Sequence, residues 1–413
     1  MKRRTFLTSL LLGSATLAGC NSFTNPCRPG PLPKQLQEHD IVTAAWKDLD
    51  PQQIWDVHVH LIGTGDDNSG CWVNPEMDSW ANPLQHISIN AYKNASCINS
   101  ERGEDKSFVE QLLLQMEAFP TGAKLLLLAF DHFHDEDGKA DLAKSFYHTP
   151  NSYAARLAQA HPDRFRWLAS IHPYRPDAIT ALKQAAADGA QGVKWLPQAM
   201  GIDPASDKCS SFYRTMAQLG LPLLCHSGEE RAVHGYGDPG LANPLRLRAA
   251  LDAGVKVIVA HCASAGDDFD LDAQPVLKVG EVTQPKKTSF ELFLRMLDNP
   301  QYKERLFGDI SATTLVNRDK NILATLLNES SWHEQLLNGS DYPLPGIPVV
   351  INLTKLQAFN FITADEKEIL SRIREYNPLL FDFVLKRTLK NGKNRFSPKV
   401  FSTARIFPGA ANL

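Results

Sequence analysis

The sequence predicts an α/β protein: a parallel (β/α)8 barrel, or TIM barrel, with a long loop insertion after its first strand. Eight short apolar segments alternate with helical patterns along most of the chain, which is the order typical of such a barrel. No Gly-x-Gly-x-x-Gly follows any of these segments, which argues against an open dinucleotide-binding sheet. The 413 residues are enough for one large α/β domain with additions.

The predicted strands are short and mainly apolar, and several end in residues that can carry chemistry. In chain order they cover residues 54–60, 123–130, 165–171, 191–196, 221–225, 255–260, 305–310 and 336–339.

The predicted helices show apolar residues at helical spacing, and Gly189, Gly220 and Gly254 stand where three of them end. Between the strands they cover residues 107–119, 152–160, 177–188, 212–219, 244–253, 289–297 and 321–327. Two more, at 365–374 and 378–389, are expected to close the body of the protein.

The insertion covers residues 61–106 and is rich in Gly, Asn, Ser and Asp. So long a loop in a compact domain is usually functional, so we expect a lid or a wall over a pocket. Trp72, Trp80 and His86 lie within it and are candidates for contact with a substrate. Alternatively, the two tryptophans pack the loop onto the body.

The first residues are expected to direct export rather than to fold. A basic head, Lys2-Arg3-Arg4, precedes an apolar core that is too short to span a bilayer. Leu17-Ala18-Gly19-Cys20 then resembles a bacterial lipoprotein cleavage site. We therefore expect lipidation of Cys20 and a mature protein anchored to a bacterial membrane, at its periplasmic face or at the cell surface. An ordinary signal peptide with an incidental Cys20 is the alternative.

Four segments follow from this reading. Residues 1–20 form the signal peptide, 21–40 a proline-rich tether, 41–390 the barrel and 391–413 a C-terminal tail.

The six other cysteines divide into two groups. Cys225 and Cys262 stand beside strand-end histidines, so they should point into the helix layer as small apolar residues. The others, Cys27, Cys71, Cys97 and Cys209, lie in expected loops, where an oxidising compartment permits disulfides whose pairing stays open.

The composition is that of an ordinary globular protein. With 43% hydrophobic residues, 22% charged residues and a net charge of −3, nothing suggests a nucleic-acid partner.

The first strand ends in two histidines, His58 and His60. Strict alternation would place both on one face, with Val57 and Val59 on the other. Two neighbouring imidazoles are suitable ligands for a metal such as zinc, and Asp56, expected on the same face, could orient one of them. Taken alone, His-x-His is also compatible with a strand that carries histidines by chance.

Three further residues occupy equivalent positions. His226, His261 and Asp341 follow the fifth, sixth and eighth predicted strands. In a barrel the carboxyl ends of the strands converge on one mouth, where catalysis takes place. Core packing or turn capping explains any one of the five residues, but it does not easily explain all five together.

This set resembles the amidohydrolase superfamily over about residues 54–381. Ser340-Asp341-Tyr342-Pro343 is similar to its aminocarboxymuconate-semialdehyde decarboxylase-like branch, which includes decarboxylases and related hydrolases and hydratases. The resemblance implies that His58, His60, His226 and Asp341 hold one divalent metal, zinc by expectation, with a water. It also implies that His261 and Asp341 take part in proton transfer to and from that water.

Lys194, in the fourth predicted strand, has two interpretations. In binuclear members of the superfamily a carbamylated lysine bridges two metals, and Trp195-Leu196-Pro197 differs from that pattern. We therefore favour a mononuclear site in which Lys194 offers a cation to a substrate carboxylate or pairs with an acid in the barrel. His172 and Trp195 are further candidates for contact with the substrate. A second metal in the acidic segment 131–137 is less favoured than ion pairs and turns.

Three functions follow, in order of preference. The first is a metal-dependent hydrolase of a small ester, lactone or amide, with a carboxylated substrate as one option. Arg102, Arg175, Arg231 and Lys194 could each bind a carboxylate, so the sequence does not separate this reaction from decarboxylation. The second is a non-oxidative decarboxylase that uses the same site. The third, disfavoured by the presence of His261, is a lipoprotein that binds a ligand without turnover.

Overall fold

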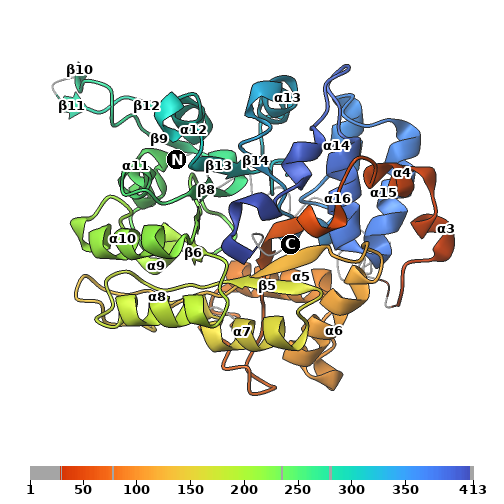
Figure 1. Cartoon of the computed structure of the whole chain (residues 1–413), viewed down its shortest axis with the longest axis horizontal. Coiled ribbons are helices and arrows are strands. Elements are labelled where there is room, and N and C mark those ends of the chain that lie inside the picture. Colours follow the sequence, from red (N-terminus) through yellow and green to blue (C-terminus); the bar gives the residue numbers. More distant parts are fainter. Residues whose placement is uncertain (1–27, 29, 77–78, 234–235, 279–280, 410–413) are drawn as a thin grey trace.

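The computed structural model describes residues 28, 30–76, 79–233, 236–278 and 281–409. Eight parallel strands form a barrel, with helices around it (Figure 1). The strands are β1 (Trp55–His60), β3 (Lys124–Leu128), β5 (Phe165–Leu168), β6 (Val193–Trp195), β7 (Leu223–Cys225), β8 (Val257–Val259), β13 (Leu306–Asp309) and β14 (Leu336–Leu337). All eight strands expected from the sequence are therefore present.

Two junctions close the barrel. The continuous hydrogen-bonded ladders give two groups, β1-β3-β5 and β14-β13-β8-β7-β6. Parallel bridges join these groups at both ends, between Ala169 and Val193 and between Val59 and Tyr342. At the second junction the Asp341 amide donates to the His58 carbonyl at 2.8 Å. The last strand therefore places Asp341 beside the first.

The helices also agree with the sequence pattern over most of the chain. Those between and after the strands are α6 (Glu104–Met116), α7 (Asn151–Ala160), α8 (Ala178–Ala187), α10 (Ser210–Leu219), α11 (Arg248–Asp252), α12 (Ser289–Leu297), α13 (Lys320–Asn328), α15 (Ala364–Tyr376) and α16 (Pro378–Thr388). Helices that the pattern did not predict are α3 (Lys34–Gln37), α4 (Asp40–Ala45), α5 (Pro83–Ala95), α9 (Pro197–Met200) and α14 (Leu353–Ala358).

Strand β1 contains an irregularity that changes which side chains face inward. Its register with β3 shifts between Asp56 and Val59. Trp55 and Val57 consequently pack in the apolar cluster inside the barrel, whereas Val59 packs outside it against the helices. The expectation that Val57 and Val59 share a face was wrong, because a β-bulge breaks the two-residue period.

Asp56 is also placed differently from the expectation. Its side chain borders a small cavity outside the barrel, together with Phe119 and Asp382, rather than facing the histidines. One carboxylate oxygen accepts the amides of His58 at 3.1 Å and of Ser340 at 2.8 Å. Asp56 therefore holds the backbones of the first and last strands together and orients no imidazole.

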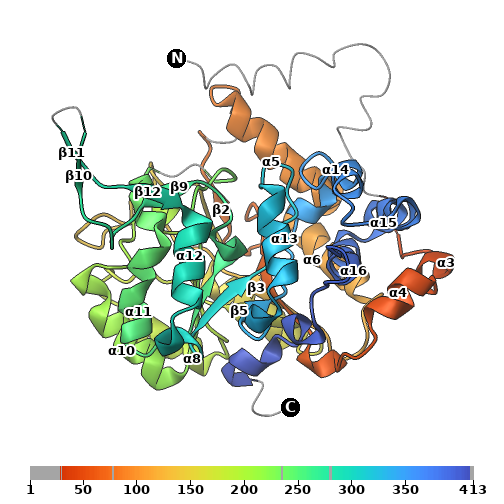
Figure 2. The ribbon, with the colours of Figure 1, turned by 90° about the horizontal axis from the view of Figure 1, so that it is seen from above.

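The described residues of the expected C-terminal tail, 391–409, pack against the barrel and belong to the body of the protein. Ala404, Ile406 and Phe407 join the apolar cluster inside the barrel, and the Phe407 ring stacks on Trp55 at 5.8 Å between centroids. The Trp55 amide donates to the Thr403 hydroxyl at 2.9 Å. These residues cover the amino-terminal end of the barrel, on the opposite side of the molecule from α5 (Figure 2).

The described part of the expected tether, residue 28 and residues 30–40, also contacts the body. Leu36 is buried, and Arg28 pairs with Glu375 at 3.0 Å. The signal peptide, Cys20 and Cys27 lie outside the described residues.

The long insertion after β1 is more regular than the sequence suggested. It contains the two-residue strand β2 (Trp72–Val73), which pairs with β4 (Tyr147–His148), and the helix α5. A second excursion follows β8, where β9 (Asp267–Phe269) pairs with β12 (Lys286–Thr288). Beyond this pair, β10 (Val276–Lys278) and β11 (Glu281–Thr283) form the arm at the upper left of Figure 1.

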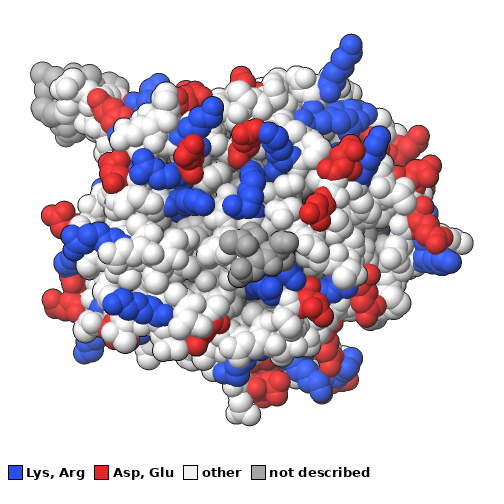
Figure 3. Space-filling view, in the orientation of Figure 1, with Lys and Arg blue, Asp and Glu red and all other residues white. Residues whose placement is uncertain are grey.

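Positive and negative side chains are interspersed over the face seen in Figure 3. Among the described helices, none combines the length and apolar character needed to cross a membrane.

The packing of the C-terminal segment leads to a stability prediction. Phe407→Ala should lower the free energy of unfolding by about 3–5 kcal/mol, because it removes a buried ring from the inside of the barrel. Val349→Ala is the matched control, since Val349 is 58% exposed, and it should change stability by less than about 0.5 kcal/mol. Urea denaturation followed by circular dichroism measures both. Equal effects in the two variants would contradict a core role for this segment.

Candidate metal centre

A cavity of about 260 Å³ opens at the carboxyl ends of the strands, the end where barrel enzymes hold their active sites. The polar residues expected from the sequence to act there line it together: His58, His60, Lys194, His226, His261 and Asp341. The strand ends therefore converge as the sequence predicted.

Three of the four expected metal ligands form a tight group. His60 Nε2 lies 3.1 Å and His58 Nε2 3.5 Å from Asp341 Oδ1. One nitrogen or oxygen from each of the three residues lies within 4.8 Å of the others. Two imidazoles and a carboxylate at such separations are suited to a divalent cation.

The fourth expected ligand, His226, lies beside this group but is not part of it. Its ring centroid is 5.3 Å from that of His261. Glu230 approaches Nδ1 at 3.3 Å, whereas Nε2 is buried and has no hydrogen-bond partner among the described residues. A buried nitrogen left unpaired is costly unless something binds it. The unpaired Nε2 is therefore consistent with metal binding at this group, and His226 would be a further ligand.

Asp309 orients the His58 ring through its Nδ1 atom. Its Oδ2 lies 2.9 Å from His58 Nδ1, and both side chains are fully buried. Asp309 therefore has the role that the sequence suggested for Asp56. The available signal was an aspartate inside an otherwise apolar strand, which is rare unless the charge is paired.

The same carboxylate also fixes His261 through Ser311. The Ser311 hydroxyl donates to Asp309 Oδ1, and His261 Nδ1 lies 2.7 Å from that hydroxyl oxygen. Since the serine hydroxyl donates its proton to Asp309, its oxygen accepts a hydrogen bond from His261, which assigns the proton of His261 to Nδ1. His261 Nε2 is then a free base, and it lies 3.9 Å from Asp341 Oδ2.

Burial keeps these imidazoles neutral. It lowers the pKa of His58 to about 4, an effect that nearby Lys194 reinforces, and it also lowers the pKa values of His226 and His261. Neutral imidazoles have a lone pair available for a metal. For Asp341 burial alone would raise the pKa, but His261, His58 and His60 outweigh it and lower the pKa well below its usual value. The site thus combines neutral imidazoles with an ionised carboxylate.

Lys194 reaches the centre of the site. Its Nζ lies 3.2 Å from His58 Nε2, and the side chain is almost fully buried. Burial lowers the pKa of this amine, although the carboxylates of Asp309 and Asp341 oppose the effect. Lys194 is therefore close enough to contact either a metal ligand or a bound substrate.

His172 and Trp195 do not line the cavity. Main-chain groups occupy both His172 nitrogens, with Nε2 bonded to the Met200 carbonyl and Nδ1 to the Tyr174 amide. Trp195 points outward into the helix layer, because neighbouring residues of a strand face opposite sides and Lys194 faces inward. The geometry thus gives no support to substrate contacts from His172 or Trp195.

The arginines proposed for carboxylate binding have acidic partners. Arg102 pairs with Glu110, and Arg175 pairs with Asp131 and Asp177. Neither lines the cavity, whereas Arg231 does and pairs with Glu229 at 2.6 Å. In the acidic segment 131–137, Asp131 pairs with Arg175 and the Asp135 carboxylate accepts the Asp137 amide in a turn. Ion pairs and turns were the interpretation favoured from the sequence for this segment.

The insertion forms a wall of the cavity. Ile62, Thr64, Val73, Ile89 and Tyr92 are among the residues that it contributes. Of the aromatic candidates, Trp80 is 75% exposed and contacts His86, and Trp72 packs edge-on against His132. None of the three lines the cavity.

The described cysteines lie outside the centre. Four of them are free and buried: Cys71, Cys209, Cys225 and Cys262. Cys97 is disulfide-bonded.

Most of the chain matches the model of a known family. The family model described as "Amidohydrolase" matches residues 55–379, which is most of the chain. No curated protein matches the chain significantly.

Three solved structures illustrate the range of similar proteins. An uncharacterized TIM-barrel protein from Bordetella bronchiseptica is 16% identical, with 70% of this chain and 86% of that chain covered and a TM-score of 0.44. A probable 2-pyrone-4,6-dicarboxylic acid hydrolase from Acinetobacter baumannii is 14% identical over 75% of this chain and 100% of its own, with a TM-score of 0.41. The 5-carboxyvanillate decarboxylase LigW from Sphingomonas paucimobilis is 12% identical over 87% of this chain and 97% of its own, with a TM-score of 0.44.

The position of Asp309 leads to a prediction about metal affinity. Asp309→Asn should weaken binding of a divalent metal about 10–100-fold, because the His58 ring loses its anionic partner. Titration with zinc against a chelating indicator measures this affinity. Asp163→Asn, which removes an exposed carboxylate at the opposite end of the barrel, is the control and should bind like wild type. Unchanged affinity in folded Asp309→Asn would contradict the orienting role.

Proposed function

The chain belongs to the amidohydrolase family, and from this premise we propose that it is a metal-dependent hydrolase of a small ester, lactone or amide. The observation that supports a hydrolytic step is the free Nε2 of His261, which faces Asp341 Oδ2 at 3.9 Å beside the proposed metal ligands. A base in this position can accept a proton from an attacking water.

The proposed ligands are His58, His60, His226 and Asp341, holding one divalent metal, with zinc as the first choice for this set of donors. A bound metal of this kind polarises a carbonyl oxygen and lowers the pKa of water. Carbamylation of Lys194 with a second metal is the alternative arrangement, and two metals per chain with one lost in Lys194→Ala would favour it.

The protein residues divide the proton transfer between them. Asp341, ionised and adjacent to His60, directs the attacking water and passes its proton on to His261. His261 takes that proton on Nε2 and can return it to the leaving group, while the Ser311 hydroxyl oxygen, 2.7 Å from Nδ1, accepts the hydrogen bond from that nitrogen. Asp309, fully buried beneath both rings, stabilises the imidazolium form of His261 during this transfer.

A substrate screen tests the reaction itself. Purified protein loaded with zinc is incubated with esters, lactones, amides and aromatic acids, and release of acid and of carbon dioxide is scored separately. Acid release without carbon dioxide is the expected result. Carbon dioxide release alone would replace the hydrolase proposal by the decarboxylase.

Two substitutions separate catalysis from folding. Asp341→Asn should reduce kcat by at least about 10²–10⁴-fold, because the charge and the base are lost together. His261→Asn should reduce kcat while retaining most of the metal. His39→Asn is the matched control, since His39 caps α4 and asparagine caps equally well. Turnover, metal content and melting temperature are measured on all three. Near-normal turnover in folded Asp341→Asn would contradict this assignment.

Export and lipid anchoring through Cys20 are a separate proposal, which rests on the basic head and the Leu-Ala-Gly-Cys sequence. Cells expressing wild type and Cys20→Ala, fed an alkyne fatty acid, should show label only on wild type. Wild type should fractionate with membranes. An unlabelled and soluble wild type would overturn the anchor.

A further inference from the structure

Acidic and basic side chains are in contact around the cavity. Each carboxylate that lines it has a basic neighbour within 3.5 Å. The contacts are Glu104 with Lys93 (3.0 Å), Glu229 with Arg231 (2.6 Å), Glu230 with His226 (3.3 Å) and Asp341 with His60 (3.1 Å). Each of these carboxylates therefore already has a basic neighbour that competes with any further cation.

Arg318 is such a further cation. It follows β13 and lines the cavity, and its hydrogen-bond partners are neutral. Nε donates to the Ser264 hydroxyl at 2.9 Å and Nη1 to the Asn317 amide oxygen at 3.1 Å. Within the described residues no carboxylate lies within ion-pair distance, and no hydrogen bond engages Nη2. The guanidinium stays charged in proteins, so one positive charge is left without an anionic partner.

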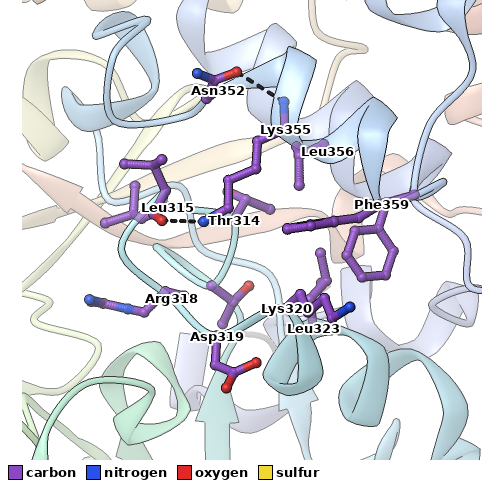
Figure 4. A pocket seen from close by; sticks show the side chains of 13 residues that line it. Thr314, Leu315, Arg318, Asp319, Lys320, Leu323, Asn352, Lys355, Leu356 and Phe359 are labelled. Carbon is purple, nitrogen blue, oxygen red and sulfur yellow. Dashed lines mark hydrogen bonds between the residues drawn. The ribbon is translucent and has the colours of Figure 1, made fainter.

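The hydrogen bonds to Ser264 and Asn317 orient the Arg318 side chain. It also borders a smaller pocket where Lys320 and Lys355 lie over the Phe359 ring. Figure 4 shows its guanidinium pointing away from that ring. Burial lowers the pKa of Arg318, whereas the carboxylates of Asp341 and Glu230 raise it, so it lies within electrostatic reach of the metal site.

Another part of the wall is apolar. Ile89 and Phe146 form a small buried cluster, against which Val73 and Val233 pack, and all four line the cavity. Such a surface gains free energy by covering alkyl or aryl groups of a ligand. The cavity therefore offers Arg318 without an ion-pair partner, one apolar wall and the proposed metal ligands.

We propose that Arg318 binds a carboxylate of the substrate while the wall of Val73, Ile89, Phe146 and Val233 holds its alkyl or aryl body. This inference rests on the proposed function, which places the bond to be cleaved at the His261–Asp341 end of the same cavity. Arginine matches a carboxylate through two parallel N–H donors, and Nη2 has its donors free.

A single carboxylate suits the site better than a dianion. The wall already carries four carboxylates, and Arg318 is a cation without an ion-pair partner. A monoanion brings one negative charge to Arg318, whereas a phosphate monoester would bring a second negative charge beside Asp341 and Glu230. Like charges held in a cavity of low dielectric repel strongly.

A comparison of the binding of a carboxylate and of an uncharged analogue with the same aryl group tests this inference. The probes are 3-phenylpropionate and 3-phenylpropan-1-ol, which share an aryl body, differ in charge and contain no bond that a hydrolase cleaves. Calorimetry on the metal-loaded protein should show about 10–100-fold tighter binding of the carboxylate. Arg318→Met should remove this preference, and Arg318→Lys should restore part of it. Arg102→Met, which alters an exposed arginine outside the cavity, should retain it.

Two results would overturn the inference. One is a wild type without preference for the carboxylate, including one that binds neither probe. The other is an unchanged preference in folded Arg318→Met, which would assign the carboxylate to the metal. Binding is measured without turnover, so the two proposals fail separately. Loss of preference in Arg318→Met with no hydrolysis of any substrate overturns only the hydrolase, and hydrolysis without carboxylate preference overturns only the role of Arg318.

Discussion

A single buried carboxylate, that of Asp309, organises the metal centre. It receives His58 Nδ1 on one oxygen and the Ser311 hydroxyl on the other, and it also accepts the amides of His261 and Ser311. Burial alone would raise its pKa, but the His58 ring and these hydrogen bonds lower it below its usual value. An anion so deeply buried is stable only because every contact on it is a donor. The orientation of both rings follows from that requirement.

The closure of the barrel supplies the second constraint. Asp341 comes from the far end of the chain, yet its amide binds the His58 carbonyl, and Asp56 joins the His58 amide to the Ser340 amide. These hydrogen bonds join the backbones of the first and last strands and place the Asp341 carboxylate 3.1 Å from His60. A site held by strands is positioned more accurately than one held by loops. Distance in sequence is therefore no obstacle to a tight centre.

Different elements of the cavity carry the residues proposed for catalysis and those proposed for substrate recognition. The strand ends carry the residues proposed for catalysis, whereas the loops after β1, β3, β7 and β13 carry the apolar wall and Arg318. Members of one barrel family can share the first set and differ in the second, because loops tolerate substitution better than buried strands. The residue pattern at the strand ends therefore identifies the family, and the loops carry the specificity.

The sequence by itself determined the eight strands, most helices and the convergence of His58, His60, His226, His261 and Asp341 on one mouth, because these depend on local periodicity and on the geometry of parallel barrels. Tertiary structure decided the rest. The bulge in β1 moved Asp56 outside the barrel, and Asp309 took its expected role through a contact between residues 251 positions apart. The C-terminal residues became part of the core, and Arg318 was left without an ion-pair partner in the wall of the cavity. Which charges pair and which face of an irregular strand is buried depend on residues far apart in the chain, and no local pattern records them.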